Sequence, residues 1–316
     1  MAEQQQVTIP VITKKDEMRA FSRKQKLAGK TVAFVPTMGY LHEGHLSLIE
    51  AAKSHADVVV ASIYVNPTQF SANEDFDVYP RNPDSDRLQL QAAGCAAVFE
   101  PEGSLYHQVP GAGDGSNVVG RESGHPDSHE TWVTVERLQQ GLCGVSRPHF
   151  FRGVATVVTK LFHIVEPDVA VFGQKDYQQW RLITRMVRDL DFPISIIGMP
   201  ICRENDGLAM SSRNARLSPE SRANALSISQ AMAWAQQAVA QRQATSAAAI
   251  AAEVRQRITA AGGEVDYVQL RDADNLHEVA DAAAQATLLA VAAWFPAKDR
   301  GTVRLIDNMV LGQLPS

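Results

Sequence analysis

Cysteine is scarce in this chain of 316 residues, which contains only Cys95, Cys143 and Cys202. The three are widely spaced and form no CxxC pair, so neither a disulfide framework nor a thiolate zinc site is expected. This usage favours a reducing compartment, and we expect a cytoplasmic protein. The sequence also lacks the apolar core of a signal peptide and any apolar run long enough to cross a bilayer, so we expect no membrane partner.

Basic charge is not in excess either. The formal net charge is -5 and the isoelectric point is about 6.0, which gives no global electrostatic reason to bind nucleic acid. An anionic ligand would have to be held by local groups. Neither a Walker GxxxxGK[ST] string nor a GxGxxG string is present, so a nucleotide would have to be bound in another way.

From residue 31 to about residue 198, short β-branched apolar runs alternate with helical patterns. The runs predict strands at 31–36, 57–65, 95–101, 168–173 and 194–198, and the patterns predict helices at 43–54, 83–93, 152–165 and 175–190. Buried strands separated by helices indicate a parallel sheet covered on both faces, with ligands at the carboxyl ends of the strands. We therefore predict an α/β domain over residues 1–200.

Beyond Cys202 the pattern changes. Ser218 and Pro219 are typical of a helix start, and apolar residues then recur at helical spacing up to Val239. A second helix is predicted over 246–261, followed by strand-like runs at 265–270, 286–295 and 302–311. We predict a second, smaller α/β domain over residues 201–316.

The stretch PTMGYLHEGHLSLIE (36–50) carries the strongest functional signal. His42 and His45 are three apart with a glycine between them, which disfavours the HExxH zinc arrangement, where ligands four apart share a helix face. Gly39 and Gly44 let a base or a phosphate approach the backbone, and a helix start offers N–H groups to an anion. Imidazoles donate hydrogen bonds to phosphate oxygens, so this stretch predicts a phosphate-binding corner.

Three further polar stretches follow predicted strands or the first domain. SIYVNPTQF (62–70) carries Asn66 and Gln69, whose amides suit hydroxyls and a carboxylate, although Asn-Pro is also a common turn. In FGQKDYQQW (172–180), Lys175 can offset phosphate charge, and Asp176 either accepts from a ligand hydroxyl or metal-bound water or simply caps the helix. GLAMSSRN (207–214) is typical either of a loop that closes over a triphosphate or of an interdomain linker.

Residues 107–130 are rich in glycine and histidine and show no periodicity, which predicts a surface loop or insertion. Metal binding by His107, His125 and His129 is conceivable there, but a loop without a ligand is favoured.

In chain order, these motifs resemble those of a known family. A His-x-Gly-His string after a strand, with a distant serine-rich basic loop, resembles the HIGH and KMSKS pair of class I aminoacyl-tRNA synthetases and related nucleotidylyltransferases. With SIYVNPTQF, YPR (79–81) and FGQKDYQQ added, the chain from about residue 31 to RLIDN (304–308) resembles the pantothenate synthetases, or pantoate–β-alanine ligases. The resemblance implies a Rossmann-like N-terminal domain, a smaller α/β C-terminal lid domain and a homodimer. It also implies that ATP, accompanied by Mg²⁺, activates pantoate as pantoyl adenylate with release of pyrophosphate, before β-alanine displaces AMP.

The resemblance also implies roles for individual residues. His45 matches the proton donor and His42 helps to stabilise the phosphates; the implied catalytic set is His45, His42, Lys175, Ser211, Ser212 and Arg213. The implied ATP-binding set is Met38, Gly39, Tyr40, Leu41, His42, Glu43, Gly44, His45, Gly173, Gln174, Lys175, Asp176, Cys202, Met210, Ser211, Ser212 and Arg213. Gln69 matches a glutamine shared by pantoate and β-alanine, with Asn66 nearby, and Gln179 matches a second pantoate glutamine. Asp86 is a candidate Mg²⁺ ligand.

One segment departs from the family pattern. RPHFFRGV (147–154) has Phe150 where Arg-Pro-x-His-Phe-x-Gly-Val places histidine, and His149 stands one position earlier. Two rival functions stay open. One is another nucleotidylyltransferase of the same fold, which would have no use for amides at Gln69 and Gln179. The other is a nucleotide-binding regulator that has lost turnover.

Overall fold

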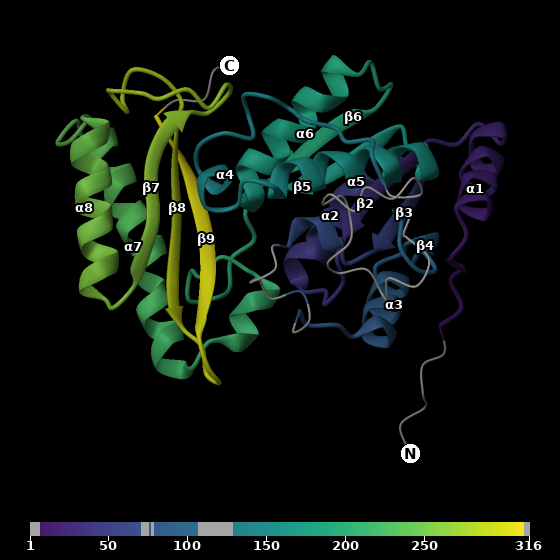
Figure 1. Ribbon diagram of the computed structural model, residues 1–316, viewed down its shortest axis with the longest axis horizontal. Coiled ribbons are helices and arrows are strands. Elements are labelled where there is room, and N and C mark those ends of the chain that lie inside the picture. The colour runs from purple at the N-terminus through teal and green to yellow at the C-terminus, as the bar shows by residue number, and fades with distance from the viewer. Residues whose placement is uncertain (1–6, 71–75, 77–78, 107–128, 313–316) are drawn as a thin grey trace. The chain divides into compact units, whose positions relative to one another are not determined.

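The computed structural model describes residues 7–70, 76, 79–106 and 129–312 (Figure 1). The chain separates into two compact units. The first comprises residues 1–139, 147–173 and 182–199, and the second comprises 140–146, 174–181 and 200–316. The second unit thus includes two short segments that precede residue 200 in the chain. The division at residues 200 and 201 expected from the sequence stays a prediction.

The first unit is built on a six-stranded sheet in which all paired strands are parallel, with the order β1-β4-β3-β2-β5-β6. Its strands are β1 Val11–Ile12, β2 Val32–Thr37, β3 Val58–Ile63, β4 Ala97–Phe99, β5 Val169–Gly173 and β6 Ser195–Met199. Its helices are α1 Lys15–Leu27, α2 Glu43–Lys53, α3 Pro83–Ala92, α5 Phe150–Val165 and α6 Tyr177–Asp189, and η1 Pro67–Gln69 is a short 3₁₀ helix. The first turn of α6 belongs to the second unit.

Helices cover both faces of this sheet, as its near-continuous apolar strands require. On one face, Leu48 and Ile49 of α2 and Leu90 of α3 pack into a core with Val35 and Val59. On the other face lies α5, whose Phe162 ring meets the Phe34 ring of β2 edge to face with centroids 6.4 Å apart. The predicted Rossmann-like parallel sheet is therefore confirmed.

The strand order reverses at β2, because β3 and β4 follow on one side of it and β5 and β6 on the other. In open α/β sheets, ligands bind at the carboxyl ends of the strands at such a point. β2 and β3 run in register from Val32↔Val58 to Thr37↔Ile63, so both end at the same edge. The segment after β2 and η1 after β3 therefore start beside one another.

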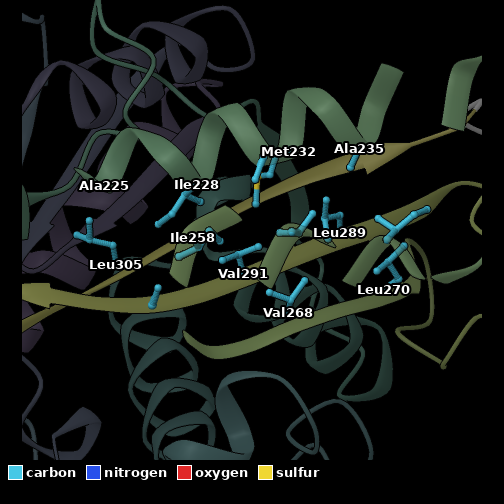
Figure 2. Close-up of a cluster of buried hydrophobic side chains, with 14 of the residues drawn as sticks. Ala225, Ile228, Met232, Ala235, Ile258, Val268, Leu270, Leu289, Val291 and Leu305 are labelled. Carbon is cyan, nitrogen blue, oxygen red and sulfur yellow. The ribbon is translucent and has the colours of Figure 1, made fainter. Parts of the chain in front are cut away.

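The second unit contains a three-stranded antiparallel sheet, β7 Glu264–Asp272, β8 Thr287–Pro296 and β9 Thr302–Leu311. Its helices are α4 Cys143–Ser146, α7 Pro219–Ala240 and α8 Ala247–Ala260, with 3₁₀ helices η2 Gln174–Asp176 and η3 Ser212–Arg216. Side chains from α7 and α8 pack on one face of the sheet (Figure 2), where Ile228 and Met232 meet Leu289 and Val291. The smaller α/β fold expected for this part is confirmed.

Two elements before residue 31 were not predicted. β1 is only two residues long, and the buried residues of α1 are Met18 and Ser22, so neither element carries much apolar periodicity. Within the described residues, no helix has both the length and the apolar character needed to span a bilayer.

Candidate active site

The loop after β2 is held by Thr37, the last residue of that strand. Its hydroxyl donates to the Ser62 carbonyl oxygen of β3 at 2.6 Å and accepts from the Gly39 N–H at 3.2 Å. Gly39 has φ +81°, and a Cβ there would lie 3.0 Å from Asp86 Oδ2 and 3.1 Å from Ile63 Cγ2. Only glycine fits this position without strain, because both the backbone conformation and the space exclude a side chain.

Asp86 of α3 supports the same loop. Its side chain is 1% exposed; Oδ2 accepts from the Tyr40 N–H at 2.7 Å and Oδ1 from the Leu41 N–H at 2.8 Å. Bonds to a charged acceptor are about twice as strong as neutral ones. Tyr40 has φ +51°, a left-handed conformation that costs a side-chain-bearing residue about 1–2 kcal/mol. The buried carboxylate therefore offsets the strain of the loop that leads to the two histidines.

His42 is the N-cap of α2, and His45 lies in the first turn of that helix. The two rings are in contact, with centroids 4.1 Å apart and planes tilted by 38°. The His42 N–H donates to His45 Nδ1 at 3.3 Å. Since Nδ1 accepts this bond, neutral His45 carries its proton on Nε2. The arrangement gives one oriented imidazole donor at a helix N-terminus, the end whose dipole favours anions.

Asn66 and Gln69 lie together at the end of β3. The Asn66 amide is 1% exposed, and its Nδ2 donates to Gln69 Oε1 at 2.9 Å and to the Gly153 carbonyl oxygen at 3.2 Å. Its Oδ1 accepts from the hydroxyls of Thr68 at 3.1 Å and Tyr106 at 3.0 Å. Burial raises the pKa of Tyr106, so this phenol stays a neutral donor. Both polar atoms of Asn66 are thus used inside the protein, and one of them orients Gln69.

The segment that departs from the family pattern contacts the same corner. The Arg147 guanidinium donates from Nη2 to the Gln69 carbonyl oxygen at 2.7 Å and lies over the Phe150 ring at 4.0 Å from its centroid. Phe150 therefore supports an arginine that fixes the backbone of Gln69. His149 is exposed and precedes α5 as its N-cap.

A glycine allows α5 to approach η1. A Cβ on Gly153 would lie 2.4 Å from the Thr68 carbonyl oxygen and 2.7 Å from its hydroxyl. Arg147, Tyr106 and Gly153 support Asn66 and Gln69, and none was predicted as a site residue. Gly153 and Arg147 stood inside the RPHFFRGV string, whereas Tyr106 had no signal in the sequence.

The second unit holds the remaining predicted residues, apart from Gly173, which ends β5 in the first unit. Lys175 and Asp176 lie in η2, and Lys175 Nζ lies 3.4 Å from Asp176 Oδ2. The Lys175 side chain is 22% exposed and that of Asp176 is 42% exposed. Asp176 is therefore accessible to a ligand, and its side chain is paired with a neighbouring cation.

The two glutamines of the first turn of α6 differ. Gln178 is 6% exposed; its Oε1 accepts from the Cys143 N–H at 3.1 Å, and its Nε2 donates to the carbonyl oxygens of Gln140 and Gly141 at 3.2 Å. It fastens the segment 140–146 within the second unit. Gln179 is half-buried, and its side chain has no hydrogen-bond partner among the described residues, which leaves its amide available to a ligand.

Cys202 and Met210 lie at the base of a short hairpin. The Met210 N–H donates to the Cys202 carbonyl oxygen at 3.0 Å, and Glu204 N–H donates to Leu208 O at 2.8 Å. Ser211 is the N-cap of η3, and its hydroxyl accepts from the Arg213 N–H at 3.3 Å. The strand-like arms of the hairpin thus lead directly into Met210–Arg213.

The structure therefore brings the predicted residues together in two sets. In the first unit, Asp86 lies with the segment Met38–His45, and Asn66 lies with Gln69. The second unit contains Gln174–Asp176 and the hairpin segment. Among the described residues, no group of three or more His, Cys, Asp or Glu side chains could hold a metal ion. His107 and His125 lie outside the described residues, so the weak metal hypothesis for 107–130 stays untested.

A parallel sheet of this strand order, with a glycine-containing loop and a helix N-terminus where the order reverses, defines a Rossmann-like nucleotide-binding protein. A family model described as pantoate-beta-alanine ligase matches residues 10–310. The pantoate–β-alanine ligase of Arabidopsis thaliana is 51% identical over 307 residues, which cover 95% of this chain and 97% of that protein. The pantothenate synthetase of Desulfatibacillum aliphaticivorans is 48% identical over 302 residues, with coverages of 95% and 99%.

Solved structures agree. The crystal structure of pantothenate synthetase from Thermus thermophilus matches with a TM-score of 0.80 at 38% identity, covering 95% of this chain and 99% of that one. A pantoate-beta-alanine ligase from Francisella tularensis, complexed with beta-gamma ATP and beta-alanine, matches with a TM-score of 0.72 at 29% identity, covering 96% and 98%. The chain belongs to the pantoate–β-alanine ligase family. The predicted enzymatic function, a ligase that condenses pantoate with β-alanine, is thereby confirmed.

Proposed function

We propose that this chain makes pantothenate in two steps at the residues described above. In the first step, a pantoate carboxylate oxygen attacks the α-phosphorus of ATP, the bond to the β-phosphate oxygen breaks, and pyrophosphate leaves. In the second, the β-alanine amine attacks the acyl carbon of pantoyl adenylate and AMP leaves. The family relationship and the ATP and β-alanine complex of the Francisella tularensis relative support this sequence of steps.

The observation that carries the proposal is the oriented His45 imidazole. Its Nδ1 accepts from the His42 backbone, so its Nε2–H donates toward the phosphates in front of the α2 N-terminus. Negative charge grows on the phosphate oxygens as the carboxylate attacks, and a fixed donor there stabilises the transition state more than the ground state. Met38–Gly44 form the backbone of the ATP-binding loop, with His42 donating to the phosphates.

Gln69 and Gln179 supply the amides for the organic substrates. Gln69 binds pantoate and β-alanine, and Gln179 binds pantoate, because uncharged amides can both donate to a carboxylate and accept from a hydroxyl. Asn66 acts on the substrates through Gln69, since its own polar atoms are bonded to protein groups. We thus propose an orienting role for Asn66 in place of direct substrate contact.

We propose further ATP-binding groups at Gly173, the end of β5, and in the second unit. Gly173 and Gln174 approach the nucleotide through their backbone, Lys175 offsets phosphate charge and Asp176 accepts from a ligand hydroxyl. Cys202 and Met210 contact ATP through their backbone, while Ser211, Ser212 and Arg213 bind the phosphates. An arginine and a lysine suit a polyanion, because the reaction requires positioning and charge stabilisation more than covalent help.

Mg²⁺ enters this reaction as part of the substrate, the Mg²⁺ complex of ATP. Asp86 does not fit as its ligand, because the carboxylate is buried and both of its oxygens accept backbone N–H groups. Mg²⁺ favours octahedral sites in which it keeps several waters, and a buried carboxylate of this kind offers no such place. Asp86 is instead proposed to shape the ATP-binding loop.

We also propose that the protein is a cytoplasmic homodimer. The three cysteines are free, with Cys95 and Cys143 buried and Cys202 half-buried, which suits a reducing compartment. The dimer rests on the family resemblance, and sedimentation or light scattering tests it.

The test is pyrophosphate release from ATP with pantoate present and β-alanine absent. Wild-type protein should release pyrophosphate, up to one equivalent per site if the adenylate stays bound. His45→Ala should slow adenylate formation about 100-fold, the usual loss of one transition-state donor, while pantoate affinity changes little. The matched control is His55→Ala, since His55 is exposed beyond the end of α2.

Equal losses in adenylation rate and pantoate affinity would reduce His45 to a binding group. Nucleotide binding without pyrophosphate release, even at high enzyme concentration, would instead favour a regulator that has lost turnover. A nucleotidyl product that survives addition of β-alanine would favour another nucleotidylyltransferase.

A further inference from the structure

β9 contains two adjacent buried polar residues, Asp307 and Asn308, which end the RLIDN string. They are 4% and 7% exposed. Every contact considered below lies within the second unit, in which β9 is an edge strand (Figure 1). A strand that packs against a core is expected to place apolar residues there, so a pair of buried polar side chains requires a reason.

Asn308 fastens η2. Its Nδ2 donates to the carbonyl oxygens of Gln174 and Lys175, both at 2.9 Å. An amide nitrogen has two hydrogens, and this geometry uses both on consecutive carbonyls. The backbone that carries Lys175 is therefore held by a side chain from a strand more than 130 residues later in the chain.

Asp307 fastens the hairpin. Its Oδ2 accepts from Arg203 Nη1 at 2.7 Å and its Oδ1 from Arg203 Nη2 at 2.9 Å, a bidentate ion pair. Arg203 Nη1 also donates to the Gly207 carbonyl oxygen at 3.1 Å, and Arg203 forms a β-bridge with Ala209. The ion pair thus holds both arms of the hairpin just before Met210–Arg213.

The two side chains point to opposite faces of the sheet, because successive residues of a strand alternate. Asp307 lies on the face of Val303 and Leu305, which α7 and α8 cover, and Asn308 on the other. The Asn308 N–H also donates to Asp307 Oδ1 at 2.8 Å, which stiffens the link between them. One peptide unit therefore fixes the spacing between η2 and the hairpin.

We propose that Asp307 and Asn308 are positioning residues for adenylation, which hold the Gln174–Asp176 segment and the Met210–Arg213 segment at the spacing that ATP requires. This rests on the proposed function, in which both segments bind ATP. A purely structural role explains the pair poorly, since buried ion pairs can often be replaced by apolar residues without loss of stability. Apolar residues at these positions could not form hydrogen bonds to two specific segments, η2 and the hairpin.

The experiment compares two variants with a matched control. Asn308→Ala removes both bonds to η2, and Arg203→Lys keeps a cation beside Asp307 but removes the fork and its bond to Gly207. The control is Asp266→Asn, which removes the negative charge from the Arg304–Asp266 ion pair of the same sheet. The two side chains are 18% and 14% exposed, and among the described residues neither contacts an ATP segment. Pantoate-dependent pyrophosphate release is measured against ATP concentration, with thermal unfolding alongside.

We expect kcat/KM for ATP to fall about tenfold in Asn308→Ala and in Arg203→Lys, while the pantoate KM stays within about twofold of the wild-type value. Asp266→Asn should lower the unfolding temperature to a similar extent and leave kcat/KM for ATP within about twofold. Should Asn308→Ala fail to fold, Arg203→Lys decides the matter alone, because its half-exposed side chain retains its charge.

Folded variants with wild-type kcat/KM for ATP would overturn the positioning role, and so would an equal loss in the Asp266→Asn control. Failure of the proposed function looks different, because wild-type protein itself would then release no pyrophosphate from ATP and pantoate.

Discussion

Replacing Asp86 with asparagine changes one atom of a buried side chain and removes its charge. Wild-type Asp86 accepts two backbone bonds, from Tyr40 and Leu41 at 2.7 and 2.8 Å. Bonds to a charged acceptor contribute about 1.5–3 kcal/mol each, and a neutral bond about 1 kcal/mol. The asparagine oxygen can keep one neutral bond, but its NH₂ group then faces the other N–H, which is left unsatisfied.

The substitution therefore destabilises the native loop conformation, relative to other conformations of the loop, by about 3 kcal/mol. Part of this loss only reduces the free-energy preference for the native loop conformation over the others. That preference is small, because the left-handed conformation of Tyr40 costs about 1–2 kcal/mol. Since about 1.4 kcal/mol corresponds to a factor of ten, kcat/KM for ATP should fall between about tenfold and about 100-fold. Pantoate-dependent pyrophosphate release at varied ATP and Mg²⁺ concentrations measures this.

Mg²⁺ concentration separates the two possible roles of Asp86. A loop-shaping carboxylate predicts that excess Mg²⁺ or Mn²⁺ does not restore the Asp86→Asn variant, whereas a metal ligand predicts substantial restoration. Asp84→Asn is the matched control, because Asp84 lies in the same helix turn with its side chain 89% exposed. Restoration by excess metal, or an equal defect in Asp84→Asn, would refute the reasoning.

Two further substitutions test the packing of the first unit. Gly153→Ala should lower the unfolding temperature and raise the pantoate KM, because the new Cβ would lie 2.4 Å from the Thr68 carbonyl oxygen. This clash should outweigh the helix propensity of alanine, which is better than that of glycine by about 1 kcal/mol. A more stable variant would show that α5 can move away at little cost. The Arg23 guanidinium donates hydrogen bonds to Glu166 and lowers the pKa of that carboxyl. The ionised Glu166 therefore stabilises the folded state above the ordinary glutamate pKa, and this stabilisation is lost as the pH falls through the lowered pKa. Glu166→Gln should therefore be less stable than wild type in thermal unfolding at neutral pH and similar to it in acid, and a difference that persists in acid would contradict this origin.

The sequence was sufficient for the fold, and it predicted a glycine-containing loop and a helix start after β2, which the structure contains. Strands such as Val58–Ile63 are nearly uninterrupted apolar runs, and the HEGH string combines a helix start with missing side chains, so both signals are local. The N-terminal elements were not predictable in this way. In α1, burial of a serine and a single methionine leaves the charged residues to dominate the pattern.

The sequence could not predict the direction in which the polar side chains of the site point. The resemblance offered Asp86 as a candidate Mg²⁺ ligand, but a carboxylate that binds a metal and one that accepts from a loop have the same sequence signal. The difference arises because α3 directs the Asp86 oxygens at two N–H groups 45 and 46 residues away. Such long-range pairing depends on tertiary structure, and no local pattern encodes it.

The run TVRLIDNMVL nevertheless contained a signal that pattern analysis could use. An apolar strand that buries an acid and an amide side by side must satisfy both, since an unpaired buried carboxylate is far more costly than an apolar residue at the same position. The partners are therefore expected to be specific groups on other segments, and here they are Arg203 and two carbonyls of η2. A polar interruption of this kind therefore indicates that a strand is bonded to other segments, while the identity of those segments follows only from the tertiary structure.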